Sequence, residues 1–190
     1  MSTHSFCFLG LLTFLAFGGL CAQEADDGGL NVRRLGAVGD GKADDTKALQ
    51  DAIGQASRHG GEIYLPAGTY RITETLVMSK LEAHSVTVRG QGGSPYGGAT
   101  RVRARKATTL LWDGDEGGTL WRSEGAFGSS WRDLNFDGGG KAGILYLATS
   151  PKGWGNMINS MSHVHFFGAD VGIQMAEKRN EFCCSDYRFD

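Results

Sequence analysis

Three short segments in the C-terminal half of the chain alternate polar and apolar residues in a way that could build a chemical site. They are Arg132-Asp-Leu-Asn-Phe-Asp137, Ser162-His-Val-His-Phe-Phe167 and Ser185-Asp-Tyr-Arg-Phe-Asp190. Alternate side chains of a strand face opposite ways. If the apolar residues of each segment point into a core, the polar residues between them point outward.

Stacking the three segments in register would align these outward side chains in two columns, with about 4.8 Å between layers. The candidate catalytic residues occupy the first column and the candidate substrate-binding residues the second: Asp133, His163 and Asp186, then Asn135, His165 and Arg188.

Such columns suit a polysaccharide of uronic acids. Arginine binds a sugar carboxylate with a forked pair of hydrogen bonds, and an imidazole or carboxylate can transfer a proton at C5 or at the glycosidic oxygen. Hydrolysis would use two carboxylates, whereas elimination needs a base and a group that neutralises the sugar acid. Outward strand positions are also polar simply because they face water, so an ordinary solvated surface is the alternative interpretation.

Other polar motifs indicate turns. Asp113-Gly-Asp115-Glu116 offers oxygen ligands for calcium, but it lacks calcium-loop spacing and Asp-Gly is itself a turn signal. The glycines between Gly36 and Gly41 lack the Gly-Lys-Ser/Thr ending of a phosphate loop. No cysteine–histidine zinc pattern is present, so we assign no metal or cofactor.

The elements that must position these residues are mostly short strands separated by glycine-rich turns, and the chain contains 30 glycines. The expected strands are Glu62–Leu65, Thr69–Thr73, Leu76–Met78, Ser85–Arg89, Thr109–Trp112, Thr119–Arg122, Trp131–Phe136, Ile144–Leu147, Met161–Phe166, Val171–Met175 and Cys184–Phe189. We expect the interval from Gly90 to Ala107 to project as a loop.

The three segments also form a weak repeat, with offsets of 30 residues from Leu134 to Val164 and 23 from Val164 to Tyr187. Repeats of this length built from strands and turns are typical of a solenoid, in which stacked units share one core. The sequence therefore predicts an all-β, single-stranded parallel β-helix. A β-sandwich is the structural alternative, because alternating short strands suit it too.

One amphipathic helix precedes the strands. Asp44 or Asp45 can cap its first turn, and Gly60-Gly61 ends it. Its apolar stripe consists of Ala48, Leu49, Ala52, Ile53 and Ala56. We expect this helix to cover one end of the stack.

The N-terminus indicates export. Residues 1–22 contain no Lys, Arg, Asp or Glu, and the apolar run from Phe6 to Leu20 is short for a membrane span. We predict a signal peptide over 1–22, a flexible leader over 23–30, and a secreted protein, extracellular or periplasmic, with no membrane segment after signal removal. The net charge of −2 does not favour nucleic acid, which needs a basic surplus.

The segment from Asn31 to Ile72 resembles the opening of the pectate-lyase superfamily domain of rhamnogalacturonase- and epimerase-like proteins. The matching residues are Leu35-Gly-Ala-Val-Gly-Asp-Gly41, Asp44-Asp-Thr46, Ala48-Leu-Gln50, Ala52-Ile53, Gly60-Gly61 and Tyr64-Leu-Pro-Ala-Gly-Thr-Tyr70. The resemblance implies a right-handed β-helix, of which residues 31–190 would be an N-terminal portion, truncated at its C-terminus. The matched residues are structural, and the Asn-Thr-Asp, Asp-Asp and Gly-His-Gly motifs of polygalacturonases are absent, so no catalytic role is transferred.

The sequence thus favours a carbohydrate-active protein that processes pectin-like acidic polysaccharide by hydrolysis or β-elimination. The alternatives are a non-catalytic glycan-binding adhesin or tailspike-like stalk, and a C5-epimerase of uronic-acid polymers. Whether the fragment alone is an enzyme stays open. An uncovered solenoid end exposes backbone groups, so a homo-oligomer is a further expectation.

Overall fold

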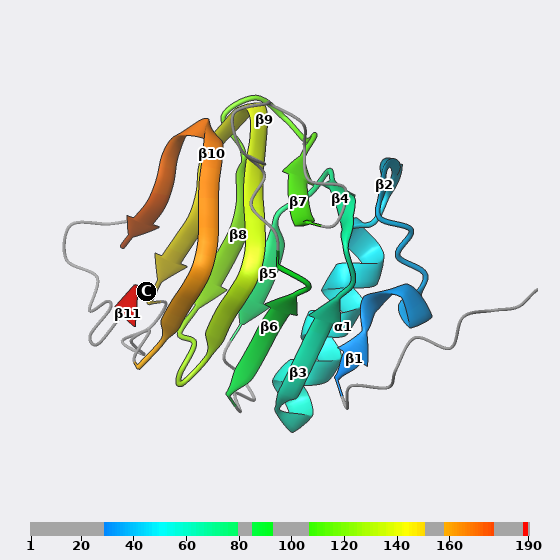
Figure 1. The fold of residues 1–190 in the computed structure, drawn as a ribbon. Helices are drawn as coiled ribbons and strands as arrows, with labels where there is room; N and C mark the ends of the chain where they lie inside the picture. Colours follow the sequence, from blue (N-terminus) through cyan, green and yellow to red (C-terminus); the bar gives the residue numbers. More distant parts are fainter. Residues whose placement is uncertain (1–28, 80–84, 93–106, 151–157, 177–187, 190) are drawn as a thin grey trace, which may run out of the picture.

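A computed structural model describes residues 29–79, 85–92, 107–150, 158–176 and 188–189. The chain is predominantly β-structure, with parallel strands wound into successive coils and one α-helix (Figure 1). Its elements are β1 (Leu30–Asn31), η1 (Val32–Leu35), β2 (Asp40–Asp44), α1 (Thr46–His59), β3 (Gly61–Leu65), β4 (Gly68–Ile72), β5 (Leu76–Ser79), β6 (Val86–Gly90), β7 (Thr108–Trp112), β8 (Thr119–Glu124), β9 (Ser130–Thr149), β10 (Ser160–Met175) and β11 (Arg188–Phe189).

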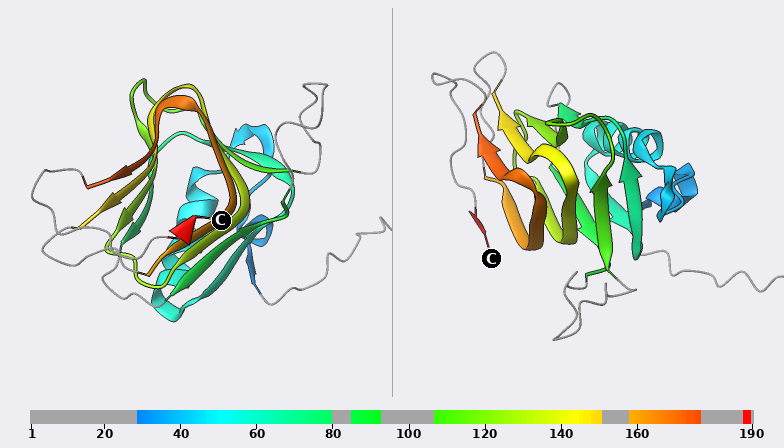
Figure 2. Two further views of the ribbon diagram at one scale, coloured as in Figure 1. Left: turned by 60° about the vertical axis from the view of Figure 1, so that its left-hand side comes forward. Right: turned by 90° about the horizontal axis from the view of Figure 1, so that it is seen from above.

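The strands form one curled sheet with three faces, which Figure 2 shows from two further directions. The first face contains β1, β3, β6, the start of β9, the start of β10, and β11. The second face contains β2, β4, β7 and the middle parts of β9 and β10. The third face contains β5, β8 and the ends of β9 and β10. Every pair among these strands is parallel, as the solenoid prediction requires.

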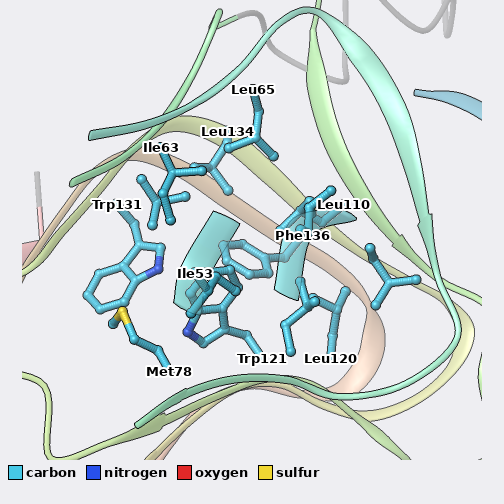
Figure 3. Close-up of a cluster of buried hydrophobic side chains, with 14 of the residues drawn as sticks. Ile53, Ile63, Leu65, Met78, Leu110, Leu120, Trp121, Trp131, Leu134 and Phe136 are labelled. Carbon is cyan, nitrogen blue, oxygen red and sulfur yellow. The ribbon is translucent and has the colours of Figure 1, made fainter. Parts of the chain in front are cut away.

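Apolar side chains fill the interior in columns that follow the register (Figure 3). On the first face, Trp131 pairs with Val88 and Met161. On the third face, Trp121 pairs with Leu76 and Tyr146. The two tryptophans meet edge to face with centroids 6.0 Å apart, a favoured aromatic geometry. Each coil therefore buries its apolar side against its neighbours rather than within itself.

Helix α1 lies in the first coil and turns its small apolar residues toward the interior. The five residues of the predicted stripe are all buried. Gly60 ends the helix at φ 71°, where glycine carries no Cβ penalty, and its N–H donates to the Ala56 carbonyl. Both sequence predictions are confirmed.

Asp44 and Asp45, either of which was expected to cap the first turn of α1, have different roles. Asp44 accepts hydrogen bonds from the Thr46 backbone N–H at 3.0 Å and hydroxyl at 2.6 Å. Asp45 is the residue at the helix start but its side chain makes no cap. Its buried carboxylate accepts instead from the N–H groups of Val38 (2.6 Å) and Gly39 (3.1 Å). Asp45 therefore fixes the glycine turn, because two backbone donors there have no strand partner.

The side chain of Gln50 on α1 satisfies the backbone of β5. Its amide nitrogen donates to the Val77 carbonyl at 2.8 Å, and its amide oxygen accepts from the Val77 N–H at 2.9 Å. Both hydrogen bonds of one strand residue are thus made by a side chain where another strand would otherwise pair.

The predicted repeat is right for two segments and wrong for the third. Leu134 pairs with Val164 and Phe136 with Phe166, at the expected offset of 30. On the next layer Ser160 pairs with Arg188 and Met161 with Phe189, an offset of 188 − 160 = 28. Phe189 therefore continues the Trp131–Met161 column and not the Phe136–Phe166 column. Short apolar alternation cannot distinguish the two faces, since both place every second residue inward.

Two further expectations concern residues outside those described: most of the loop after Gly90 (residues 93–106) and most of the strand predicted over Cys184–Phe189 (residues 184–187). The remaining strand predictions coincide with described strands. Strand β2, which consists of Asp-Gly-Lys-Ala-Asp and carries no apolar alternation, was not predicted.

Candidate functional site

The first face presents a continuous outward column of polar and aromatic side chains. Ile63, Val88, Trp131 and Met161 point inward, so the residues that follow each of them point outward. In register these are Tyr64, Arg89, Arg132 and Ser162. We call this column, together with Glu62, the arginine face.

Glu62 bridges both arginines. Its Oε1 lies 2.7 Å from Arg89 Nε, and its Oε2 lies 2.7 Å from Arg132 Nη2. The Arg89 guanidinium also lies 4.2 Å from the centre of the Tyr64 ring, a cation–π contact. Glu62 and Arg89 have side chains that are 21% and 19% exposed, whereas Arg132 is 46% exposed.

Asp133 and His163 meet at the corner between the first and second faces. Asp133 Oδ1 lies 3.3 Å from His163 Nδ1, and both side chains reach solvent. Both residues have left-handed backbone angles, φ 58° and φ 52°, and the pairing ladder skips both of them. Each is a one-residue bend, repeated at the same place in successive coils. The predicted adjacency of these two candidate catalytic residues is confirmed.

The second predicted column is only partly formed. Asn135 and His165 are paired between β9 and β10, and His165 is exposed. Asn135 is fully buried, and its amide nitrogen donates to the Thr108 carbonyl at 2.9 Å. The structure thus gives Asn135 a backbone-bonding position, while substrate contacts by these residues stay predictions.

The described part of the third predicted layer does not join the second column. Arg188 pairs with Ser160 on the first face, one face away from His165, so its expected alignment with His165 is wrong. Asp186 lies outside the described residues. The physical reason is the 28-residue offset, which places the third segment earlier in its coil than sequence alternation suggested.

The acidic turn after β7 is occupied by cations from its own chain. Lys141 Nζ lies 2.6 Å from Asp113 Oδ1, and Arg71 Nε lies 2.7 Å from Oδ2. The hydrogen bond from Lys141 and then that from Arg71 lower the pKa of Asp113 to about 2. Among the residues described, no three His, Cys, Asp or Glu side chains gather as a metal site, so calcium at this turn gains no support.

Sequence reasoning missed the arginine face. Alternation with Ile63 and Val88 could have placed Tyr64 and Arg89 outward. Alternation from Leu134 would have placed Arg132 inward, and the bend at Asp133 reverses this. Their alignment could not be seen, because the coils between them differ in length: Arg89 follows Tyr64 by 25 residues and Arg132 follows Arg89 by 43.

The face and the corner together combine a guanidinium donor fork, a bridging carboxylate and a carboxylate–imidazole pair. Arginine recognises carboxylates in a planar, two-bonded geometry, and a carboxylate beside an imidazole orients it for proton transfer. These are groups suited to an acidic, hydroxylated ligand.

Parallel strands curled into a stack with an outward polar column define the molecule as a parallel β-helix protein. Residues 29–96 match the family "Rhamnogalacturonase A/epimerase, pectate lyase-like", which confirms the resemblance that the N-terminal motifs predicted.

Relatives agree with this assignment. The plasmin and fibronectin-binding protein A of Streptococcus pneumoniae is 45% identical over 64 residues, covering 33% of this chain and 9% of that protein. Alginate lyase 7 of Azotobacter vinelandii is 54% identical over 44 residues, covering 23% of this chain and 5% of that protein. The solved A-module of the A. vinelandii mannuronan C-5 epimerase AlgE6 is 25% identical with a TM-score of 0.53, covering 76% of this chain and 40% of the module.

The chain thus spans less than a tenth of the first two relatives' length. In the part of the chain that the structure describes, no helix is both long and apolar enough to cross a membrane.

Proposed function

We propose that this protein is a secreted carbohydrate-active protein that acts on acidic polysaccharide along its first face. The observation that carries the proposal is the contact of 3.3 Å between His163 and Asp133 on the outer surface, one residue from the exposed guanidinium of Arg132. The family match over residues 29–96 supports a polysaccharide as the class of ligand.

The chemistry that suits this geometry is proton abstraction from a uronate. Asp133 orients the imidazole of His163, which takes the C5 proton of the sugar ring. The guanidinium of Arg132 neutralises the adjacent sugar carboxylate and so stabilises the carbanion-like charge. Cleavage of the C4–O bond, with a proton from solvent going to the departing oxygen, then gives β-elimination, and return of a proton from solvent to the opposite face of C5 gives epimerisation.

Hydrolysis has less support. A hydrolase needs a protonated acid and a second carboxylate about 5 to 9.5 Å apart across the scissile bond. The two carboxylates of this surface are already engaged by other side chains: Asp133 contacts His163, and Glu62 is bound by two arginines.

Several structural expectations belong to the same proposal. Residues 1–22 act as a signal peptide, and the leader that follows it ends before Leu30, which already lies in β1 and pairs with Ile63. The coils wind right-handed as most parallel crossovers do, and α1 covers the N-terminal end of the stack.

The test compares wild-type protein with Asp133→Asn and His163→Ala on polygalacturonate, rhamnogalacturonan and alginate. Elimination is measured by the ultraviolet absorbance of unsaturated sugars, hydrolysis by reducing ends, and C5 exchange by deuterium uptake from heavy water. Loss of a positioned general base should lower the rate about 10²- to 10⁴-fold without lowering the melting temperature. His59→Gln, an exposed histidine at the end of α1, is the matched control. Unchanged rates in both site variants would reduce the pair to ordinary surface groups.

A non-catalytic binding protein is the second candidate. The observation that favours it is the identity of 45% over 64 residues to a plasmin- and fibronectin-binding protein. Tight binding of a glycan or host protein, with neither product nor deuterium uptake on any polymer, would select this candidate.

A further inference from the structure

We propose that Glu62 is a built-in occupant of a carboxylate-binding site, and that the carboxylate of an acidic sugar displaces it from Arg132. This inference rests on the proposed function. It adds that Arg132 recognises the sugar carboxylate and that Glu62 occupies the site when no ligand is bound.

The carboxylate of Glu62 already binds both Arg89 and Arg132. Glu62 lies in β3 and Arg132 in β9, which stand two layers apart along the stack with β6 between them, a separation of about 10 Å. The Arg132 side chain must therefore extend along the face to reach Glu62 Oε2 at 2.7 Å. An arginine so placed can meet a ligand that runs over the same layers.

The two halves of this bridge are held unequally. Arg89 is 19% exposed and lies over the Tyr64 ring, so its contact with Glu62 is enclosed and fixed. Arg132 is 46% exposed, and its contact with Glu62 is open to solvent. Ion pairs exposed to solvent contribute little to stability. Arg132 is therefore the partner that can change without disturbing the rest of the face.

The surroundings suit a sugar that carries one carboxylate. Among the residues described, one glutamate lies between two arginines. Hydroxyl groups flank it: Ser130 and Thr87 lie 3.1 Å apart, and the Ser162 hydroxyl lies 3.4 Å from His163 Nδ1. A uronate offers both the carboxylate and the ring hydroxyls, and its methyl ester offers only the hydroxyls.

The experiment measures the affinity of the full chain for oligogalacturonate and for its methyl-esterified form by calorimetry. Glu62→Gln keeps an oxygen that can accept from Arg89 and removes the acceptor for Arg132. We expect it to bind oligogalacturonate about 3- to 10-fold more tightly, with the gain falling as salt is added. The ester should show no gain. Glu74→Gln removes one negative charge at an exposed position away from the first face and should leave the affinity within about twofold, since isolated surface charges at this distance are screened.

Arg132 is tested by two variants. Arg132→Ala should weaken binding of the acid about tenfold or more, and Arg132→Lys should restore only part of it, because lysine keeps the charge and loses the fork. Unchanged melting temperatures would show that all variants fold.

The possible outcomes separate the inference from the function on which it rests. If wild type binds the acid and Glu62→Gln binds it no better, the displacement proposal is overturned while the proposed function stands. If neither wild type nor Glu62→Gln binds the acid or any other uronate, both are overturned. Binding by Glu62→Gln alone would support a site that wild-type Glu62 holds fully closed.

Discussion

At the scale of single residues, several carboxylates among the residues described are held by other side chains of the chain. Asp113 is held by Lys141 and Arg71, Asp44 by two threonines, and Glu62 by two arginines. Apart from the contact of Asp44 with Thr46, these contacts join segments that are far apart in sequence. Asp113, which the sequence offered as a calcium ligand, thus makes two ion pairs within the chain.

The Asp113 contacts predict a defined dependence of stability on acidity. The pKa of Asp113 is lowered from 3.8 to about 2, first by Lys141 and then by Arg71. Its contribution to stability is therefore fully present above about pH 4 and is lost as the pH falls toward 2. Asp113→Asn should lower the melting temperature at pH 7, and the difference from wild type should narrow between pH 4 and 2. A difference that stays constant over this range would contradict the ion-pair account.

At the scale of elements, the strands were predictable because their inward residues are apolar and their turns contain glycine. Which residues pair between neighbouring layers was harder to predict from the sequence. The alignment of Leu134 with Val164 could be predicted because their segments share one alternation of polar and apolar residues at an offset of 30 residues. That of Arg188 could not, since a change of offset to 28 moves it to another face. The arginine face could not be predicted for the same reason. Its residues are separated by coils of unequal length, so no constant spacing in the sequence indicates that they align.

Helix α1 yields the prediction at this scale. Gln50 makes both backbone hydrogen bonds of Val77, so Gln50→Ala leaves one donor and one acceptor unpaired in a partly buried place. We expect a loss of about 1–2 kcal/mol in the free energy of unfolding, measured by urea denaturation. Gln55→Ala, on the same helix, is the control and should change it by less than about 0.5 kcal/mol. Equal losses would mean that the effect comes from the helix and not from the strand edge.

At the scale of the whole molecule, stability should vary along the stack, because each coil contacts only its neighbours. The third-face part of β9 pairs with both β8 and β10. The matching part of β10 has β9 as its one strand partner among the residues described, and its Val171 and Met175 are exposed.

Hydrogen exchange can measure this gradient. Backbone amides of residues 144–149 should exchange at least tenfold more slowly than those of 171–175, since inner layers open only with larger parts of the structure. Equal protection of the two segments would indicate that the stack unfolds as one cooperative unit and that its stability does not vary from layer to layer.

The repeated left-handed bends at Asp133 and His163 have a consequence for how such a surface can diversify. Each bend is set by backbone angles and skipped by the strand ladder, so its side chain lies outside the ladder. A substitution there changes side-chain contacts between layers, such as that of Asp133 with His163, and leaves the paired strand residues as they were. New chemistry can therefore arise on this edge one position at a time, while the scaffold beneath it persists.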